Sequence, residues 1–256
     1  MVKQKFLQHL DASQFIFKRS DAEGTPFIFS PIISGPGTVT VETGAVQYNT
    51  TQVYTGTTTL KGSTVLQVGD TTTNGWIDPA STINDGGKLI FQRNDTKTIP
   101  NYIYGSGNVI FRSTGTFTLA TDNDYQGGTT IEPGTTLILA SARGAGTGTI
   151  SITDTGDLRF NGSVTGSMTV NNAISAVGQG RDNKGVLRNI LGNNSLSGTI
   201  TLGSSIFIGT SPGVGNDLTV SGLITDGTKF YGITLFGEGK LILTNANTYD
   251  GNTNLF

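Results

Sequence analysis

The sequence predicts an all-β fold, a solenoid in which short strands stack coil upon coil. A phrase of strands and turns occurs three times along the chain, beginning at Gly44, Gly115 and Gly239. The composition agrees with this fold, since 37 of the 256 residues are glycine and only 13% are charged. Abundant Thr, Val and Ile together with many glycines favour short strands joined by tight turns. A repeat of this kind decides the fold class before any other feature is considered.

The three copies agree at six positions beyond the opening glycine, with no gaps between them. Two are apolar strand positions, two form a Tyr-x-Gly turn, and two begin and end a second short strand. The shared residues are Val46, Phe117 or Leu241; Tyr48, Leu119 or Leu243; Tyr54, Tyr125 or Tyr249; Gly56, Gly127 or Gly251; Thr58, Thr129 or Thr253; and Leu60, Ile131 or Leu255. Chance similarity between Gly- and Thr-rich sequences does not account for this agreement.

Each copy predicts a strand, a turn and a second strand. In the second copy, alternation over residues 116–119 places Phe117 and Leu119 on one face. The opening glycine is expected to turn the chain with a positive φ, and Tyr125-Gln126-Gly127 to close a second turn. One such unit has a single apolar face that it cannot bury alone, whereas stacked copies can. We therefore expect the three tyrosines of the phrase to occupy equivalent places against the core.

The third copy reads Asn-Thr-Tyr-Asp-Gly-Asn-Thr over residues 247–253 and resembles the passenger-associated transport repeat, also called the autotransporter-associated β-strand repeat. The second copy keeps the asparagine as Asn123, while the first has Gln52 in its place and departs most. The resemblance implies a right-handed parallel β-helix on a secreted or surface-displayed protein. Over residues 35–256 it predicts about 9–11 coils of roughly 20–25 residues each. It specifies the fold well and the activity hardly at all.

Charge and composition argue against several classes of function. The net charge is −2 with only 16 Lys and Arg residues, so we expect no nucleic-acid partner. The chain contains no cysteine, which excludes disulfides and thiolate metal sites. No apolar run approaches the length of a membrane-spanning helix, so we expect no membrane insertion.

Few residues are available for catalysis. The sole histidine, His9, lies in the N-terminal part that lacks the repeat, so a Ser-His-Asp site is not expected. Asp154 and Asp157, or Glu42 with a residue one coil away, could supply the two carboxylates of a carbohydrate-cleaving enzyme. Stacked coils bring such pairs together without any catalytic purpose. The sequence therefore predicts no enzyme.

Three segments are candidate binding sites. Asp-Asn-Asp at 122–124 resembles the start of a calcium loop, but Pro133 stands where the bidentate Glu is needed. The glycines of residues 144–148 lack the spacing of a dinucleotide fingerprint. We expect turns at both places, with no metal and no cofactor. Residues 178–185 predict a loop that leaves the solenoid wall, and such loops usually carry the binding residues of a solenoid.

Residues 1–34 lack the phrase and predict a separate N-terminal segment. They hold five phenylalanines, and their opening Lys-x-Lys-Phe-Leu-x-x-Leu-Asp resembles the first residues of many phage tail-fibre and other virion proteins. The apolar stretch of a signal peptide is missing. Because no repeat phrase buries these phenylalanines, we expect residues 1–30 to lie outside the regular coils and to contact another chain; the alternative is a hydrophobic cap on the solenoid. The expected attachment residues are Phe6, Leu7, Leu10, Phe15 and Phe17.

Taken together, these features favour a structural or adhesive virion appendage protein of the tail-fibre kind, located on the virion. Its N-terminus would dock to the particle and its β-helix would project outward to bind a host-surface glycan or protein. The first alternative is a fragment of an autotransporter passenger, secreted or on the bacterial cell surface, that acts as an adhesin. The second alternative is a polysaccharide-degrading tailspike. Expected partners are other virion or surface-assembly proteins and further copies of this chain, with a trimer favoured.

The third copy of the phrase stops at residues 254–256, where the first two copies continue into another strand. A coil that ends in this way exposes strand edges and an apolar face, which natural solenoids cover. We therefore expect either that the protein continues past Phe256 or that another subunit covers this end.

Overall fold

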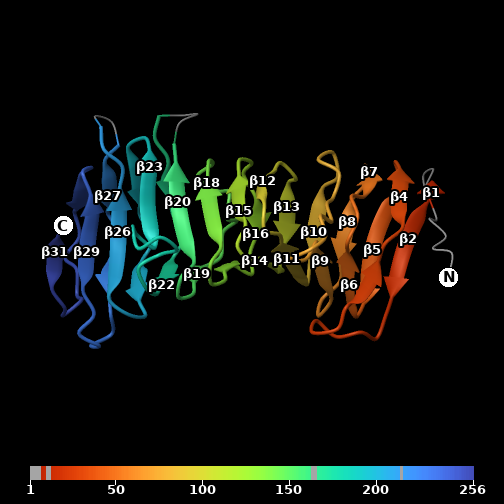
Figure 1. Ribbon diagram of the computed structural model, residues 1–256, viewed down its shortest axis with the longest axis horizontal. Helices are drawn as coiled ribbons and strands as arrows, with labels where there is room; N and C mark the ends of the chain where they lie inside the picture. Colours follow the sequence, from red (N-terminus) through yellow and green to blue (C-terminus); the bar gives the residue numbers. More distant parts are fainter. Residues whose placement is uncertain (1–6, 10–12, 163–165, 214–215) are drawn as a thin grey trace.

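The computed structural model describes residues 7–9, 13–162, 166–213 and 216–256. These residues form strands and no helix, so none of them belongs to a helix that could cross a membrane. The strands stack in parallel as a solenoid of about 11 turns. The first and last described strands lie at opposite ends of an arched rod (Figure 1). The prediction of an all-β parallel solenoid is confirmed.

Most coils pass three sheet positions in turn, named here the first, second and third walls. The second wall is one continuous ten-stranded sheet that runs along the rod. Its strands are β3 (Phe27–Phe29), β6 (Ala45–Tyr48), β9 (Val65–Val68), β11 (Lys88–Gln92), β14 (Asn108–Arg112), β17 (Thr129–Ile131), β19 (Ile150–Ile152), β22 (Ile174–Ala176), β25 (Ile200–Leu202) and β28 (Ile224–Thr225).

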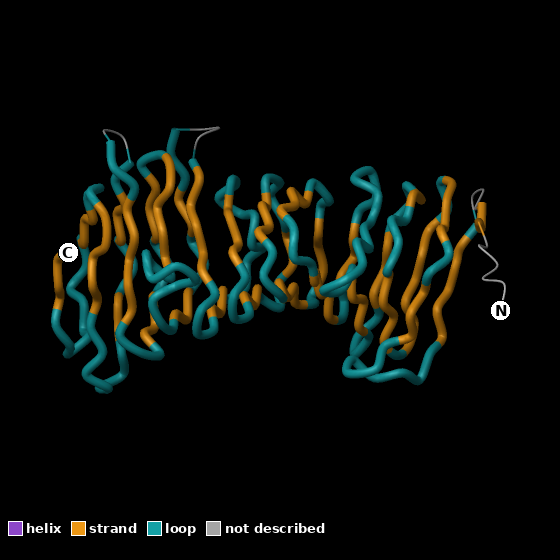
Figure 2. The backbone as a smooth tube through the Cα atoms, in the orientation of Figure 1, coloured by secondary structure: helices purple, strands orange, loops and turns teal. Residues whose placement is uncertain are grey.

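The first and third walls each change from one sheet to another along the rod. The strands of the first wall are β2 (Gln14–Lys18), β5 (Thr38–Thr43), β8 (Thr58–Leu60), β10 (Ile83–Asp85), β13 (Ile103–Gly105) and β16 (Asp124–Tyr125), then β21 (Thr169–Val170), β24 (Asn194–Leu196), β27 (Leu218–Val220) and β30 (Leu241–Leu243). Those of the third wall are β1 (Leu7–His9), β4 (Ile32–Gly35) and β7 (Val53–Tyr54), then β12 (Thr96–Ile99), β15 (Thr116–Leu119), β18 (Thr136–Leu139), β20 (Asp157–Asn161), β23 (Leu187–Leu191), β26 (Ile206–Thr210), β29 (Ile233–Gly237) and β31 (Thr253–Leu255). Figure 2 shows these strands side by side along one axis, with loops and turns at the corners.

The core consists of ladders in which apolar side chains of successive coils stack on one another. On the second wall, Val46, Leu66, Leu89 and Val109 are successive register partners, and all four are fully buried. Alternation turns the residues between them outward. Each coil buries its inward face against its neighbours, so the hydrophobic core lengthens with every coil.

The prediction that residues 1–30 lie outside the regular coils is wrong for their described part. Strand β2 pairs in parallel with β5, and β3 pairs in parallel with β6, so residues 14–29 form a coil of the solenoid. Strand β4 also crosses the predicted boundary at residue 34 without interruption. The role of residues 1–34 as an attachment or capping segment stays a prediction.

Alternating aromatic residues explain why this part joins the solenoid. Phe15 and Phe17 are two residues apart in β2, so both rings fall on the inward face, with centroids 4.9 Å apart. Both contact Phe29, at 5.7 and 5.0 Å, and Phe17 also approaches Tyr48 at 6.2 Å. Tilted and edge-on contacts at these distances add to the stabilisation from burial. These phenylalanines continue the apolar core into the first described coil.

Candidate functional site

The tyrosine of each phrase makes the same hydrogen bond. Its phenolic oxygen lies 2.6 Å from the hydroxyl of the threonine four residues later in every copy. The pairs are Tyr54 with Thr58, Tyr125 with Thr129, and Tyr249 with Thr253. Each bond spans the turn between two strands, which makes the Tyr-x-Gly-x-Thr phrase a corner of the coil.

The amide two residues before each tyrosine bonds to the backbone of the preceding coil. Its side-chain oxygen accepts a hydrogen bond of 2.8–2.9 Å from a backbone N–H in all three copies. The pairs are Gln52 with Ile33, Asn123 with Ile103, and Asn247 with Ile224. The glutamine of the first copy therefore takes over the role of the asparagine, and this copy is an equivalent corner although its sequence departs most.

The glycine two residues after each tyrosine is required by close approach between coils. A Cβ there would lie 2.3 Å from the carbonyl oxygen of Gly37 at Gly56, and 2.5 Å from that of Gly107 at Gly127. At Gly251 it would lie 2.4 Å from the carbonyl carbon of Tyr231. The expected positive φ of the opening glycine holds at Gly44 only. At the other two copies the opening glycine instead leaves room for the preceding coil's backbone.

The three tyrosines share these bonds but not one position in the fold. Tyr54 lies on the third wall and Tyr125 on the first, and both are fully buried. Tyr249 follows the bridge between Thr225 and Thr248 on the second wall and is only half-buried. The expectation of equivalent places against the core is therefore correct for the local contacts and wrong for wall and burial. Burial also raises the pKa of Tyr54 to about 12, so its phenol stays protonated.

Removing the tyrosine hydroxyl should have a different effect at the buried and the half-buried corner. We expect Tyr125→Phe to lower the free energy of unfolding by about 1 kcal/mol, because one buried hydrogen bond is lost while the ring still fills its place. Tyr249→Phe should change it by less than about 0.5 kcal/mol, because water can replace the partner. Chemical denaturation of both variants measures the difference. Equal losses would show that burial does not decide the strength of this bond.

The residues of the calcium-like segment, 122–124, take part in structural contacts. The carboxylate of Asp124 pairs with Arg143, and that of Asp122 accepts a hydrogen bond from the Ser141 hydroxyl. Asn123 between them is buried. The calcium-like segment is thus a coil corner, and among the described residues no group of three or more His, Asp or Glu side chains could hold a metal ion.

The carboxylates considered for hydrolysis do not form an exposed pair. Asp157 is fully buried, and its Oδ2 lies 2.7–2.8 Å from two nitrogens of Arg159. Asp154 is exposed at a turn where its φ is 41°. Glu42 forms an exposed ion pair with Lys18 at 3.2 Å. The glycine-rich residues 144–148 form a further corner. Gly146 is needed there because a Cβ would lie 2.3 Å from the Tyr125 carbonyl oxygen.

Three of the five expected attachment residues lie in the described part of the chain. Phe17 is 4% exposed and Phe15 is half-buried against the core, so both serve the first described coil. The backbone of Leu7 belongs to β1, which pairs with β4. Phe6 and Leu10 fall outside the described residues. Contact of these residues with another chain stays a prediction.

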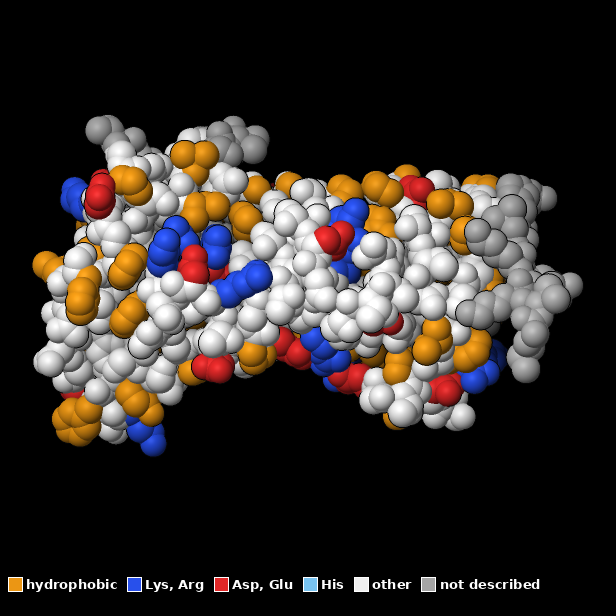
Figure 3. Space-filling model, viewed as in Figure 1, with side chains coloured by type: hydrophobic (Ala, Val, Ile, Leu, Met, Phe, Trp, Pro, Cys, Tyr) orange, Lys and Arg blue, Asp and Glu red, His pale blue; other side chains and the backbone are white. Residues whose placement is uncertain are grey.

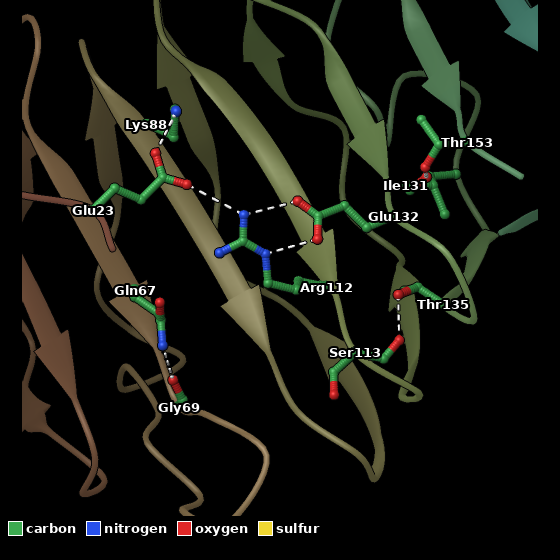
Figure 4. A network of polar contacts seen from close by, with 10 residues as sticks. All are labelled: Glu23, Gln67, Gly69, Lys88, Arg112, Ser113, Ile131, Glu132, Thr135 and Thr153. Atoms are coloured by element: carbon green, nitrogen blue, oxygen red, sulfur yellow. Dashed lines mark hydrogen bonds and ion pairs between the residues drawn. The ribbon is translucent and has the colours of Figure 1, made fainter. Parts of the chain in front are cut away.

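A loop that the sequence did not single out lies along the outer face of the second wall. Residues 19–26 connect β2 to β3, and the Asp21 carbonyl accepts a hydrogen bond from Ala45 N at 2.9 Å. Glu23 contacts β11 and β14, which lie further along the rod, through ion pairs of 2.6 Å to Lys88 and 3.2 Å to Arg112 (Figure 4). Arg112 in turn holds both carboxylate oxygens of Glu132.

This ion network crosses an apolar stretch of the outer face. Ile90 and Ile110 are register partners that alternation turns outward, yet they are only 0% and 7% exposed. Lys88 lies two residues before Ile90, and Arg112 lies two residues after Ile110, so the bonds to Glu23 pass over this row. The hydrogen bond from Lys88 helps to lower the pKa of Glu23, which keeps the carboxylate ionised. The network fastens the loop to the wall and helps to shield the isoleucines.

These observations define the class of the protein as a parallel β-solenoid with repeated Tyr-x-Gly-x-Thr corners. A family model described as the Passenger-associated-transport-repeat matches residues 112–140 and 233–255, which contain the second and third copies. The chain is also similar to the Adhesin BmaC autotransporter of Brucella suis biovar 1 (strain 1330), with 30% identity over 206 residues. That similarity covers 77% of this chain and 5% of the adhesin's length. No solved structure matches the chain.

Proposed function

We propose that this chain is a segment of the passenger of a bacterial autotransporter adhesin, secreted or displayed on the cell surface. The observation that carries the proposal is the repeat. Two copies match the passenger-associated family model, and all three form the same corner in the folded chain. The similarity to an autotransporter adhesin over most of this chain supports the same function. Neither finding supports the virion appendage favoured by the sequence, nor its location on a virion.

An elongated solenoid suits adhesion because it presents long outer walls on a rigid rod. Beyond β14, the outward row of the second wall consists of small hydroxyl-bearing side chains at direct register positions. They are Thr130, Ser151, Ser175, Thr201 and Thr225. Regularly spaced hydroxyls can donate and accept hydrogen bonds with glycans or peptides. We also propose that the chain binds a ligand and does not catalyse a reaction. Of the candidate carboxylates, Asp157 is buried and paired, Glu42 is paired, and Asp154 is exposed at a turn.

An adhesion assay with the purified chain tests this proposal. Beads coated with the 256-residue protein should adhere to epithelial cell monolayers several-fold more than beads coated with serum albumin. Adhesion should disappear when the soluble chain is added in excess, because it occupies the same receptors. Adhesion no greater than that of the albumin beads would contradict the proposal. Release of reducing sugar from cell-surface or bacterial polysaccharide would contradict its non-enzymatic part. Assembly as a trimer stays a separate prediction, which sedimentation can test.

A further inference from the structure

Cationic side chains gather on the outer face of the third wall, over β20, β23 and the loop that follows β22 (Figure 3). Arg159 of β20 and Arg188 of β23 are direct register partners. Like charges at such positions repel and are unfavourable unless other groups balance them. The 178–185 loop adds Arg181 and Lys184, both exposed. We name Arg159, Arg181, Lys184 and Arg188 the cationic cluster.

Two carboxylates hold the arginines in place without neutralising the cluster. Asp157 binds Arg159 within its own strand. Asp182 of the loop lies 3.2 Å from Arg188 and 3.8 Å from Arg159, so it bridges the two strands. Among the described ion pairs, none involves Arg181 or Lys184. Four cations against two carboxylates leave an excess of positive charge in a chain whose net charge is −2.

A glycine on the third wall gives the 178–185 loop room to lie against the strand. Gly209 of β26 is the register partner of Arg188, and Phe236 of β29 is the next partner along the rod. A Cβ at Gly209 would lie 2.1 Å from the Lys184 carbonyl oxygen and 3.0 Å from Arg188 Cγ. Only glycine at this position lets the loop lie against the strand. The outward row of the wall therefore has a gap between an arginine and a phenylalanine.

A small open hollow of about 200 Å³ lies beside this gap. Its lining combines cationic, apolar and hydroxyl-bearing groups with one carboxylate. The lining includes Lys184, Arg188, Thr210, Ser211, Phe236 and Glu238. Thr210 is 4% exposed and its hydroxyl is shielded from solvent, so the groups open to a ligand are those of Ser211, Phe236 and Glu238, together with the two cations.

We propose that the cationic cluster and this hollow bind a sulfated polysaccharide, an inference that rests on the proposed adhesive function. Guanidinium groups recognise tetrahedral and planar oxyanions with paired N–H donors. The cations lie on neighbouring strands and their connecting loop, roughly 4.8 Å apart per strand, so the matching ligand presents anionic groups in series. The hollow takes one sugar ring, with Phe236 against its apolar face and Ser211 and Glu238 for its hydroxyls. Glu238 would repel a phosphate placed there but accepts hydrogen bonds from sugar hydroxyls.

Binding of heparin to the 256-residue chain tests the proposal, with hyaluronate, dextran and double-stranded DNA as comparison ligands. Heparin should bind most tightly, and dextran not at all. The double variant Arg181→Ser/Lys184→Ser should bind heparin about tenfold more weakly at low salt, because screening is then least. Phe236→Ala should weaken binding several-fold, because the sugar ring loses its apolar contact. Lys61→Ser/Lys229→Ser, which removes two exposed cations elsewhere, is the matched control and should bind like the parent chain.

Each result has a defined meaning. An equal loss in the control variant, unchanged binding in the Arg181/Lys184 variant, or DNA binding as tight as heparin binding would overturn the sulfated-polysaccharide site. Coated beads that adhere to cells while the chain fails to bind heparin would overturn this inference and leave the adhesin function standing. Beads that fail to adhere while heparin binds with the expected variant pattern would overturn the adhesin function and leave the site.

Discussion

Replacing Gly127 with alanine should lower the free energy of unfolding by about 3 kcal/mol. A Cβ at this position would lie 2.5 Å from the Gly107 carbonyl oxygen and 2.6 Å from its carbonyl carbon. Both are backbone atoms of the preceding coil, so no flexible side chain can rotate away and the two coils have to separate. The separation would also lengthen the hydrogen bond of 2.9 Å from Gly127 N to Gly107 O.

Urea unfolding followed by circular dichroism measures the loss, and amide hydrogen exchange locates it. Exchange should become faster in the coils next to residue 127, because each coil contacts only its neighbours. Gly62→Ala is the matched control. A Cβ there meets no atom closer than 3.8 Å, so the change should stay within about 0.5 kcal/mol. A Gly127→Ala protein as stable as the parent would show that this glycine does not set the spacing of the coils.

The phrase was sufficient to predict the solenoid because its positions are tied to backbone geometry. Gly127 is needed because two coils approach closely there, the Tyr125 hydroxyl bonds across a corner, and Asn123 bonds to the backbone of the preceding coil. These roles depend on residues a few positions apart or one coil away, so they recur wherever the phrase recurs. The same locality explains why Gln52 could not be recognised as a substitute. Its longer side chain reaches the equivalent backbone N–H, that of Ile33, which depends on the spacing of the folded coils.

Other features depend on separations that a local pattern does not contain. The phrase specifies a corner but not its wall, and the three copies begin on the second, third and first walls in turn. The coil formed by residues 14–29 has no phrase, although its alternating phenylalanines occupy the core. Glu23 meets Arg112 across 89 residues of sequence. The cationic cluster likewise depends on the register of Arg159 with Arg188 and on a loop seated by Gly209.

Asp85 is a further feature that sequence alone did not suggest, a fully buried carboxylate at the end of β10. Its Oδ1 accepts a hydrogen bond of 3.0 Å from Gly87 N, while its Oδ2 has no partner among the described residues. The first contact helps to hold the turn after β10, and a Cβ at Gly107 would lie 2.3 Å from the same Oδ1. Burial raises the pKa of Asp85 to about 7, against the Gly87 hydrogen bond, which lowers it.

The raised pKa gives the protein a pH dependence of defined sign. Between the ordinary value of 3.8 and about 7, the folded chain keeps the Asp85 proton while the unfolded chain has released it. The folded state therefore loses stability as the pH rises through this window, by at most about 4 kcal/mol, and the contribution is constant above it. Asp85→Asn keeps an acceptor for Gly87 N and has no proton to release. We expect the variant and the parent to be about equally stable near pH 4, and the variant to be more stable by about 3 kcal/mol at pH 8.

Denaturant unfolding at several pH values between 4 and 8 measures this effect, with Asp154→Asn as the control. Asp154 is exposed at a turn, so its replacement should leave the pH dependence of the parent unchanged. Part of the slope should remain in the Asp85 variant, because burial also raises the pKa of Asp157 against the opposing effects of Thr136 and Arg159. If the curves of parent and Asp85→Asn run parallel from pH 4 to 8, the carboxyl group of Asp85 is ionised in the folded protein throughout, and its burial does not set the pH dependence.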